Sequence, residues 1–469
     1  MTESEQAIQT AARIAIDFIR AESAPPAPRL EPGTLERKLD LALPAEGRPM
    51  EEVARRLAAV IAATPSSSNR RFYSQLFGGR DLPATMGEML TAVTNNSMYT
   101  FKAAGVHILL ERTIIAKLAR MVGFEDGEGA FAPGGSMSNL AAMLIAREEM
   151  LPGVREQGVG AHLAVLYTSA EAHYSIPKAV NILGLGRSNL RKIPVDDVGR
   201  MIPAELDRAI RADLARGLHP IMIVATAGTT VQGAFDDLNQ LADIAAAHGL
   251  WFHVDGAFGA SVLLSHRHRH LMRGVERADS VVWDAHKVMG VPLTCSVALM
   301  KRRGLLARHI GEPAEYLFQS DDDEINPGTR SLQCGRRNDA LKLWCAWQAK
   351  GDAGYAARID RLFEQAALVR SVVEEDPDLV LSCEPQSMTV CFEVAGRSSI
   401  EICDRLDREG TLKLSYGIVA GRAVVRMVCV NPDLTDDDLR QAMELIRDRG
   451  LALPEADNAI DEAATHAAG

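Results

Sequence analysis

Short apolar runs alternate with helical patterns between about residues 100 and 300. The strand-like runs cover residues 163–169, 221–230, 251–259, 280–287 and 296–300. A helical pattern at 238–249 lies between two of them and ends at Gly249. Continuous apolar strands separated by helices predict a mostly parallel sheet with helices on both faces. We therefore expect an α/β fold for this part of the chain.

The patterns before and after this region differ from it. Apolar residues at helical spacing predict helices near 8–19 and 50–63, with a Pro-rich linker after the first. From about residue 345, a long helix, alternating runs and a closing helix predict a smaller α+β domain. We expect a helical extension, a large domain, a small domain and a disordered polar tail, over residues 1–70, 71–344, 345–455 and 456–469. Two apolar faces in the extension favour a partner subunit.

Composition narrows the class of protein. The formal net charge of −11 disfavours general binding to nucleic acid or to an anionic membrane surface. Seven cysteines without a CxxC pair are typical of reduced core thiols. The N-terminus lacks a basic region and a long apolar block, and no run reaches the ~20 apolar residues of a membrane span. We therefore expect a cytoplasmic protein.

Two polar residues close neighbouring apolar runs. Ligands of parallel sheets bind beyond the carboxyl ends of the strands. Asp255 ends WFHVD, and Lys287 follows VVWDAH one strand-helix-strand step later. This spacing predicts that both reach the same edge of the sheet. Taken singly, Asp255 is more often a loop or cap residue and Lys287 a solvated lysine.

A glycine-rich segment, FAPGGSMSNLAAMLIAR at 131–147, precedes a helical pattern. Backbone N–H groups at a helix N-terminus bind phosphate, although a plain helix cap explains the pattern equally well. The segment lacks the GK[ST] ending of a P-loop and the GxGxxG pattern. A lysine amine, an acid and a phosphate cradle together fit pyridoxal 5'-phosphate.

The chain resembles the group II pyridoxal-phosphate decarboxylases, in the branch of the glutamate and cysteine sulfinate decarboxylases. The resemblance covers about residues 70–430 and rests on ordered motifs that include FAPGGSMSN, HVDGAFGA, DAHKVMGVPL and SLQCGRRNDALKLWCAWQAKG. It implies a fold-type I enzyme with a large, mostly parallel sheet domain, a smaller α+β C-terminal domain and N-terminal helices. It also implies a homodimer with the active site at the interface.

The resemblance assigns roles to residues of the motifs. Lys287 carries the cofactor as an internal aldimine, Asp255 pairs with the pyridine nitrogen, and His173 stacks on the ring as a catalytic acid or base. Tyr316, in a mobile loop, protonates the quinonoid that follows loss of carbon dioxide. The other cofactor contacts that it implies are Gly135, Ser136, Met137, Thr226, Ala257, His286 and Gly328.

A second set of residues predicts which substrate the enzyme uses. Arg426 lies inside an apolar run, and a buried guanidinium needs an anion. The resemblance implies that Arg426 and Gln75 hold the substrate's α-carboxylate perpendicular to the ring, which selects decarboxylation. Phe77, Ser97 and Tyr99 match the members of the family that use cysteine sulfinate or aspartate, which implies that Phe77 shortens the pocket and that Ser97 and Tyr99 bond a short acidic side chain. We therefore expect decarboxylation of cysteine sulfinate or aspartate, giving hypotaurine or β-alanine.

Other activities stay open at this point. Within enzymes they are decarboxylation of glutamate or of an aromatic amino acid, and an oxidative variant that gives an aldehyde, which Tyr316 disfavours. A different class is a non-catalytic paralogue that binds the cofactor.

Four features depart from the family's pattern or suggest other chemistry. The family often has Asn where Asp284 stands, and we expect Asp284 to point away from the phosphate or to bond to backbone. Lys102 and Arg80 either make the pocket more cationic or face solvent. The histidines in SHRHRHLM at 265–272 suggest a metal, but the interleaved arginines favour a solvated basic loop.

Overall fold

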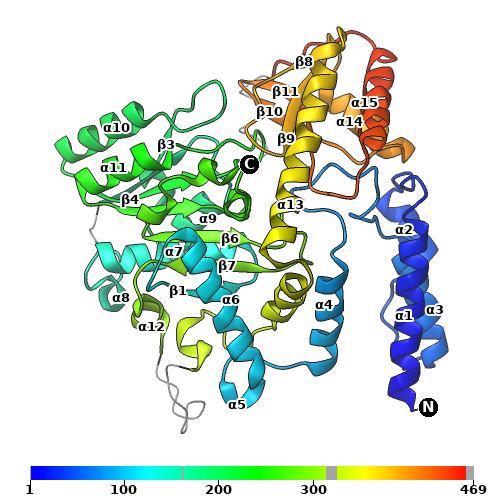
Figure 1. Cartoon of the computed structure of the whole chain (residues 1–469), viewed down its shortest axis with the longest axis horizontal. Helices are drawn as coiled ribbons and strands as arrows, with labels where there is room; N and C mark the ends of the chain where they lie inside the picture. Colours follow the sequence, from blue (N-terminus) through cyan, green and yellow to red (C-terminus); the bar gives the residue numbers. More distant parts are fainter. Residues whose placement is uncertain (1, 161–162, 313–324, 461–469) are drawn as a thin grey trace. The chain divides into compact units, whose positions relative to one another are not determined.

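The computed structural model describes residues 2–160, 163–312 and 325–460 (Figure 1). The chain divides into two compact units. The larger unit comprises Arg80–Ala367 and Cys383–Val390, and the smaller comprises Met1–Gly79, Leu368–Ser382 and Cys391–Gly469. The four divisions expected from the sequence stay a prediction.

The larger unit is built on a seven-stranded sheet with the order β1-β7-β6-β5-β4-β2-β3. The strands β1 to β7 span Glu128–Ala132, Ala164–Ser169, Leu190–Ile193, His219–Thr226, Trp251–Asp255, Ser280–Asp284 and Ser296–Met300. Strands β3, β2, β4, β5 and β6 run parallel, whereas β7 is antiparallel to both β6 and β1. The prediction of a mostly parallel sheet is confirmed.

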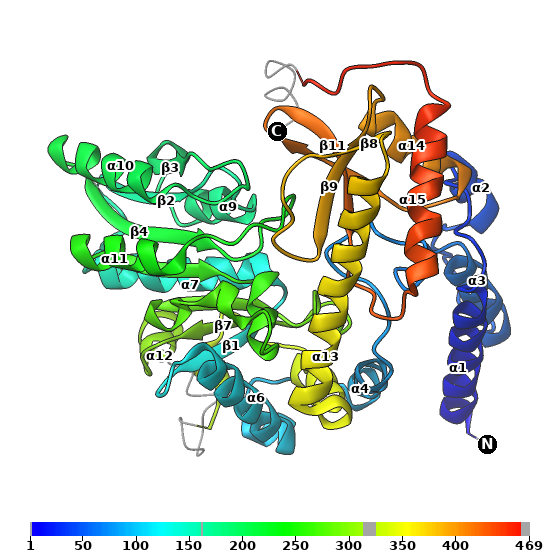
Figure 2. The same cartoon turned by 45° about the horizontal axis from the view of Figure 1, so that its top comes forward.

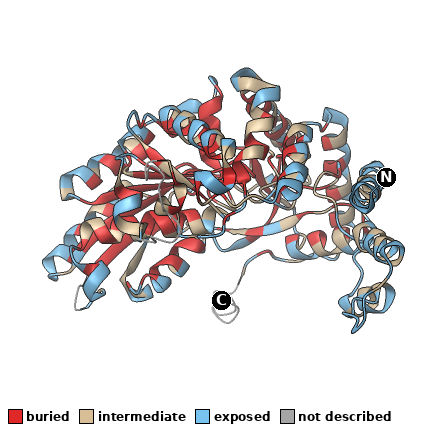
Figure 3. Cartoon of the chain, turned by 90° about the horizontal axis from the view of Figure 1, so that it is seen from below, coloured by how far each residue is buried: buried red, intermediate tan, exposed pale blue. Residues whose placement is uncertain are grey.

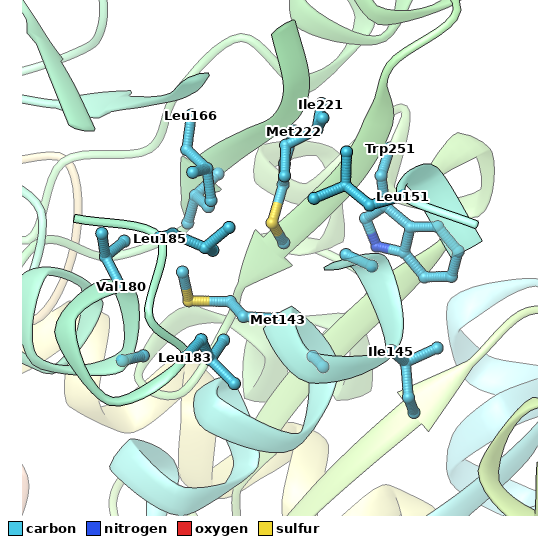
Figure 4. Packing of buried hydrophobic residues seen from close by; sticks show 14 of the residues in the cluster. Met143, Ile145, Leu151, Leu166, Val180, Leu183, Leu185, Ile221, Met222 and Trp251 are labelled. Atoms are coloured by element: carbon cyan, nitrogen blue, oxygen red, sulfur yellow. The ribbon is translucent and has the colours of Figure 1, made fainter. Parts of the chain in front are cut away.

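The central strands are buried on both faces. Every residue of β2, β5, β6 and β7 is buried, and successive strand residues face opposite sides of a sheet. Figure 4 shows side chains from β2, β4 and β5 meeting those of two helices in one apolar cluster. These helices are α7, Gly135–Met150, and α9, Ser175–Ile182. The helices α10, Pro203–Ala215, and α11, Leu238–His248, also pack on β4.

Further helices complete the larger unit. The α-helices α4, α5, α6, α8 and α12 span Leu82–Thr94, Phe101–Ala104, Val106–Val122, Val154–Gln157 and Leu305–Ile310. Short 3₁₀ helices span Arg187–Asn189, Gly259–Leu264, Arg269–Met272, Val275–Arg277 and Pro327–Arg330. The long helix α13, Asp339–Glu375, contributes residues to both units and is interrupted at Gly351, whose φ is +62°.

The smaller unit combines helices with a four-stranded sheet of order β10-β11-β9-β8. The strands β8 to β11 span Leu379–Leu381, Thr389–Val394, Ser415–Val419 and Arg422–Val428. The helix α14, Ser399–Glu409, packs on β10, β11 and α15, Asp436–Leu451 (Figure 2). The N-terminal helices α1, Glu3–Ala21, and α3, Met50–Ala62, pack together, yet neither contains a buried residue (Figure 3). The predicted helices and α+β pattern are confirmed.

Two irregular segments contain structure that the sequence did not predict. The helix α2, Pro32–Leu39, begins at the end of the Pro-rich linker, because a proline fits the first turn of a helix. The tail is not disordered from its start: Asn458 is buried, accepts a hydrogen bond from the backbone N–H of Ser399 (2.8 Å) and donates to Glu393 (2.7 Å). Among the described residues, no helix is long and apolar enough to cross a membrane.

Candidate active site

The ends of β5 and β6 bring the first two predicted site residues to one edge of the sheet. These strands are parallel neighbours, and Asp255 pairs in register with Val282. Lys287 lies on the turn directly after β6, where its backbone N–H donates to the carbonyl of Asp284 (3.2 Å). The topology therefore places the carboxylate and the amine as the spacing predicted.

Two donors hold the carboxylate of Asp255, which is buried. The side-chain amide of Asn139 donates to Oδ2 (2.9 Å), and the backbone N–H of Ala257 donates to Oδ1 (3.2 Å). Asn139 comes from α7, whereas Ala257 follows β5. The buried carboxylate is thus fixed between a helix and the loop that continues its own strand.

His173 lies at the same site, two residues before the start of α9. Its Nδ1 atom is 2.8 Å from Oγ of Ser175. Partial burial lowers the pKa of the imidazole, and the charge of Asp255 opposes this change. Lys287 and Asp284 also act on the imidazole through their charges. The charges of Asp255 and Lys287, the two residues predicted to hold the cofactor ring and its aldehyde carbon, therefore both act on His173.

The glycine-rich segment forms the N-terminus of α7, as predicted. Gly134 has a φ of +102°, which favours glycine, and the helix begins at Gly135. A Cβ atom on Gly135 would lie 2.6 Å from Oδ2 of Asp284, so any larger residue there would have to displace this carboxylate. The first N–H groups of a helix have no partner within it. Ser136 is exposed and Met137 half-buried at this terminus.

Asp284 does not point away from this terminus, so that expectation is wrong. Its buried carboxylate lies 3.3 Å from Nζ of Lys287 and 3.5 Å from Nε2 of His286. Nδ1 of His286 bonds with the backbone of Cys295, and burial lowers the pKa of this imidazole. Among the described residues, Oδ1 of Asp284 has no hydrogen-bond partner. An acid at the end of β6 faces the helix because Gly135 leaves room for it.

Thr226 ends β4 with a free hydroxyl. The residue is buried, and its backbone N–H donates to Oδ2 of Asp236 (2.7 Å). Burial raises the pKa of Asp236 to about 6. Within the described part of the chain, Oγ1 of Thr226 has no hydrogen-bond partner. A buried hydroxyl without a partner is costly, and this one lies at the carboxyl end of β4, where it can bond to a ligand.

Three other predicted residues of the larger unit lie close together. Gly328 donates its backbone N–H to the carbonyl of Tyr99 (2.9 Å), and a Cβ on Gly328 would lie 2.6 Å from the tyrosine ring. Two residues away, Ser97 accepts a hydrogen bond from the backbone N–H of Arg336 (3.4 Å).

Lys102 is exposed, which agrees with the alternative that this lysine faces solvent.

The predicted carboxylate-binding arginine belongs to the smaller unit. Arg426 on β11 is buried and donates to the carbonyl of Ser74 (2.6 Å) and to Oγ of Ser415 (3.2 Å). Burial lowers the pKa of its guanidinium. The neighbouring Gln75 is exposed and Phe77 is half-buried. Arg426 thus lies beside the segment that carries both other predicted substrate contacts of this unit.

Two remaining predictions concern the loops. Tyr316 lies outside the described residues. In the predicted basic loop, His266 and His270 are exposed, whereas His268 stacks on Phe363 with ring centroids 3.6 Å apart. Across the described ranges, no group of three or more His, Cys, Asp or Glu residues could hold a metal ion.

These groups fit pyridoxal phosphate. The amine of Lys287 and the carboxylate of Asp255 lie at one sheet edge beside a helix N-terminus that can bind phosphate. The partnerless hydroxyl of Thr226 supplies a further buried contact. A family model described as the pyridoxal-dependent decarboxylase conserved domain matches residues 32–395. The chain belongs to this family and is a pyridoxal-phosphate-dependent amino acid decarboxylase.

The chain is similar to three characterised kinds of acidic amino acid decarboxylase. The chain is 41% identical over 435 residues to the cysteine sulfinic acid decarboxylase of Mus musculus, covering 87% of this chain and 88% of the relative. It is 35% identical to an acidic amino acid decarboxylase, GADL1, of Bos taurus, covering 87% and 83%. It is 37% identical to the glutamate decarboxylase of Drosophila melanogaster, covering 90% and 85%.

A solved structure agrees with the fold. The crystal structure of mouse CSAD has a TM-score of 0.92 to this chain at 36% identity, covering 95% of this chain and 98% of the other. The expected fold-type I architecture is therefore confirmed.

Sequence reasoning missed three buried side chains around Asp255. These are Asn139, Ser175 and His253, to which the sequence motifs assign no role of their own. Asn139 is not a helix cap, because the N-cap position is Gly134. One signal was available for His253: it precedes Asp255 by two residues on a strand, so both side chains lie on the same face.

Proposed function

We propose that this enzyme decarboxylates a short acidic L-amino acid, cysteine sulfinate or aspartate, giving hypotaurine or β-alanine. The observation that carries this proposal is the combination of Phe77 with Ser97 and Tyr99, the pattern of the family members that use short acids. The 41% identity to a cysteine sulfinic acid decarboxylase supports it.

Each residue has a proposed role. When bound, pyridoxal phosphate supplies an electron sink for the carbanion left at the substrate's Cα. Nζ of Lys287 would hold the cofactor. The carboxylate of Asp255, which Asn139 and Ala257 fix, would accept a hydrogen bond from the nitrogen of its ring. His173 would contact the cofactor and act as an acid or base. Tyr316 would supply a proton to the Cα atom of the substrate.

The remaining proposed contacts divide between cofactor and substrate. The N-terminus of α7 would bind the phosphate of the cofactor, and the hydroxyl of Thr226 would bind its ring hydroxyl. Arg426 and Gln75 bind the α-carboxylate of the substrate, which orients the bond that breaks. The further cofactor contacts are Gly135, Ser136, Met137, Ala257, His286 and Gly328.

Carbon dioxide release from purified enzyme tests the substrate. We expect cysteine sulfinate or aspartate to have the highest kcat/KM in a panel with cysteate, glutamate and aromatic amino acids. Glutamate belongs in the panel because of the 37% identity to a glutamate decarboxylase. A preference for glutamate or an aromatic substrate would overturn the proposal.

We also propose a cytoplasmic homodimer with the active site at its interface. Seven free cysteines support the location. The surface of α4 supports the dimer, because large apolar side chains are exposed along one face of this helix: Leu82, Met86, Met89, Leu90 and Val93.

Sedimentation tests the assignment of α4 to the dimer interface. A variant with Met86→Glu and Leu90→Glu should show dissociation, because the substitutions place two charges on the apolar face. Leu214→Glu is the matched control: it replaces another exposed leucine, on α10, and should leave the dimer intact. A monomeric wild type, or a double variant that stays dimeric, would contradict this assignment.

A further inference from the structure

A chain of buried hydrogen bonds leads to Asp255 from within the sheet. Nε2 of His253 lies 3.0 Å from Oδ1 of Asn139, whose amide nitrogen donates to Asp255. Nδ1 of His253 lies 2.8 Å from Oγ of Ser280, which accepts a hydrogen bond from the indole of Trp251 (2.9 Å). All five residues are buried, so water does not compete for these bonds.

The chemistry of the groups fixes the direction of every bond. A carboxylate only accepts, so the amide nitrogen of Asn139 must face Asp255 and its oxygen must face His253. Nε2 of His253 therefore carries a proton. Burial lowers the pKa of His253 to about 4, so the ring is neutral at neutral pH and Nδ1 accepts from Ser280. The reversed amide would bring its oxygen against the carboxylate and leave two acceptors facing each other.

A second branch runs from the same amide to His173. The amide nitrogen of Asn139 donates to Oγ of Ser175 (3.2 Å). The backbone N–H of Ser175 donates to Nδ1 of His173 (3.2 Å), so this ring nitrogen is an acceptor. Oγ of Ser175 is the second group at Nδ1, at 2.8 Å, and donates to it. The proton of a neutral His173 then lies on Nε2.

We propose that Asn139 is a positioning residue whose single amide holds the Asp255 carboxylate and, through Oγ of Ser175, the imidazole of His173, in an orientation that His253 dictates. The inference rests on the proposed roles of Asp255 and His173. Its consequence is that the cofactor's acid partner and the stacking imidazole cannot be oriented independently.

The tautomers can be measured without cofactor or substrate. We expect ¹⁵N spectra of full-length, cofactor-free enzyme with labelled histidine to show protons on Nε2 of both His173 and His253. The signals are assigned by their loss in His173→Gln and His253→Gln. A proton on Nδ1 of either ring in the wild type would overturn the inference. Because this readout requires no turnover, it can succeed even if the proposed substrates fail.

Substitution of Asn139 tests the coupling. Asn139→Asp brings a second carboxylate against Asp255, and we expect pyridoxal phosphate to bind at least tenfold more weakly and the ¹⁵N signals of His173 to move. Ser138→Ala is the matched control: it removes a neighbouring buried hydroxyl of α7, which bonds only to Ser296 in the described structure, and should change cofactor affinity less than twofold. Unchanged cofactor binding and unchanged His173 signals in Asn139→Asp would overturn the proposal. If that variant does not fold, the wild-type tautomers still decide it.

Discussion

The carboxylate of Asp284 lies 3.3 Å from the Nζ atom of Lys287, three residues further along the chain. The acid is buried, whereas the lysine side chain is partly exposed. The same carboxylate oxygen faces Gly135 at the start of α7. Asp284 therefore lies between the amine and the proposed phosphate site, and its charge acts on both.

This position predicts tighter cofactor binding in Asp284→Asn. The substitution removes an ion pair from the cofactor-free state and a repulsion from the phosphate-bound state. We expect the Kd for pyridoxal phosphate to fall roughly tenfold, or ~1.4 kcal/mol, in a titration of cofactor-free enzyme. Asp279→Asn, at the opposite end of β6, should leave the Kd unchanged. Weaker binding in Asp284→Asn would mean that the acid makes a favourable contact with the cofactor.

Thr226→Val should weaken cofactor binding without changing the stability of the cofactor-free enzyme. Because Oγ1 has no partner among the described residues, its removal should change the unfolding free energy of the cofactor-free enzyme by less than ~0.5 kcal/mol. Cofactor affinity should fall about fivefold, since a hydrogen bond contributes ~1 kcal/mol. Thr168→Val is the control: its hydroxyl donates to Val224, so stability should fall by ~1 kcal/mol without loss of cofactor affinity. The opposite pattern would show that Thr226 is structural.

Phe77→Ser should shift substrate preference toward glutamate. A smaller side chain lengthens the proposed pocket, so the ratio of kcat/KM for glutamate to that for cysteine sulfinate should rise roughly tenfold. The control is Phe18→Ser, which removes another half-buried phenylalanine of the smaller unit and should leave the ratio unchanged. An unchanged or lower ratio in Phe77→Ser would count against the pocket assignment.

The buried His253 predicts a dependence of stability on pH. Its pKa is about 4 in the folded state and 6.5 in the unfolded state, so the unfolded chain binds more protons between these values. The stabilising contribution is present above pH 6.5 and is lost as pH falls toward 4, by at most ~3 kcal/mol.

Urea unfolding of cofactor-free enzyme checks this contribution. The difference in stability between the wild type and His253→Gln should narrow as pH falls from 6.5 to 4. His219→Gln, which removes an exposed histidine, should run parallel to the wild type. A constant difference between wild type and His253→Gln would refute the assignment of this pH dependence to His253.

Features that depend on neighbouring residues or on general rules of sheet topology could be predicted from the sequence, whereas a contact between distant side chains could not. The start of α7 was predictable because Gly134 and Gly135 determine it locally. The meeting of Asp255 and Lys287 was predictable because strand order in parallel sheets follows general rules. The direction in which the Asp284 side chain points was not predictable, because it depends on the absence of a Cβ atom on Gly135, 149 positions earlier in the chain.

The network around Asn139 could not be predicted for a related reason. Its partners Ser175 and His253 lie 36 and 114 positions away, and each contact is between side chains. Hydrophobic periodicity shows which face of an element is buried, but it does not show which polar groups meet there. Each donor and acceptor in the network can be assigned only when all of the groups that meet there are known.

The strand β5 carries His253 and Asp255 two residues apart, and both reach the same asparagine. Deleting a single residue between Trp251 and Asp255 would turn one of them to the opposite side of the sheet. Point substitutions in β5 can be tolerated one at a time, but a change of length cannot be. In a comparison of sequences from this family, this strand should accept varied apolar residues and no insertions or deletions.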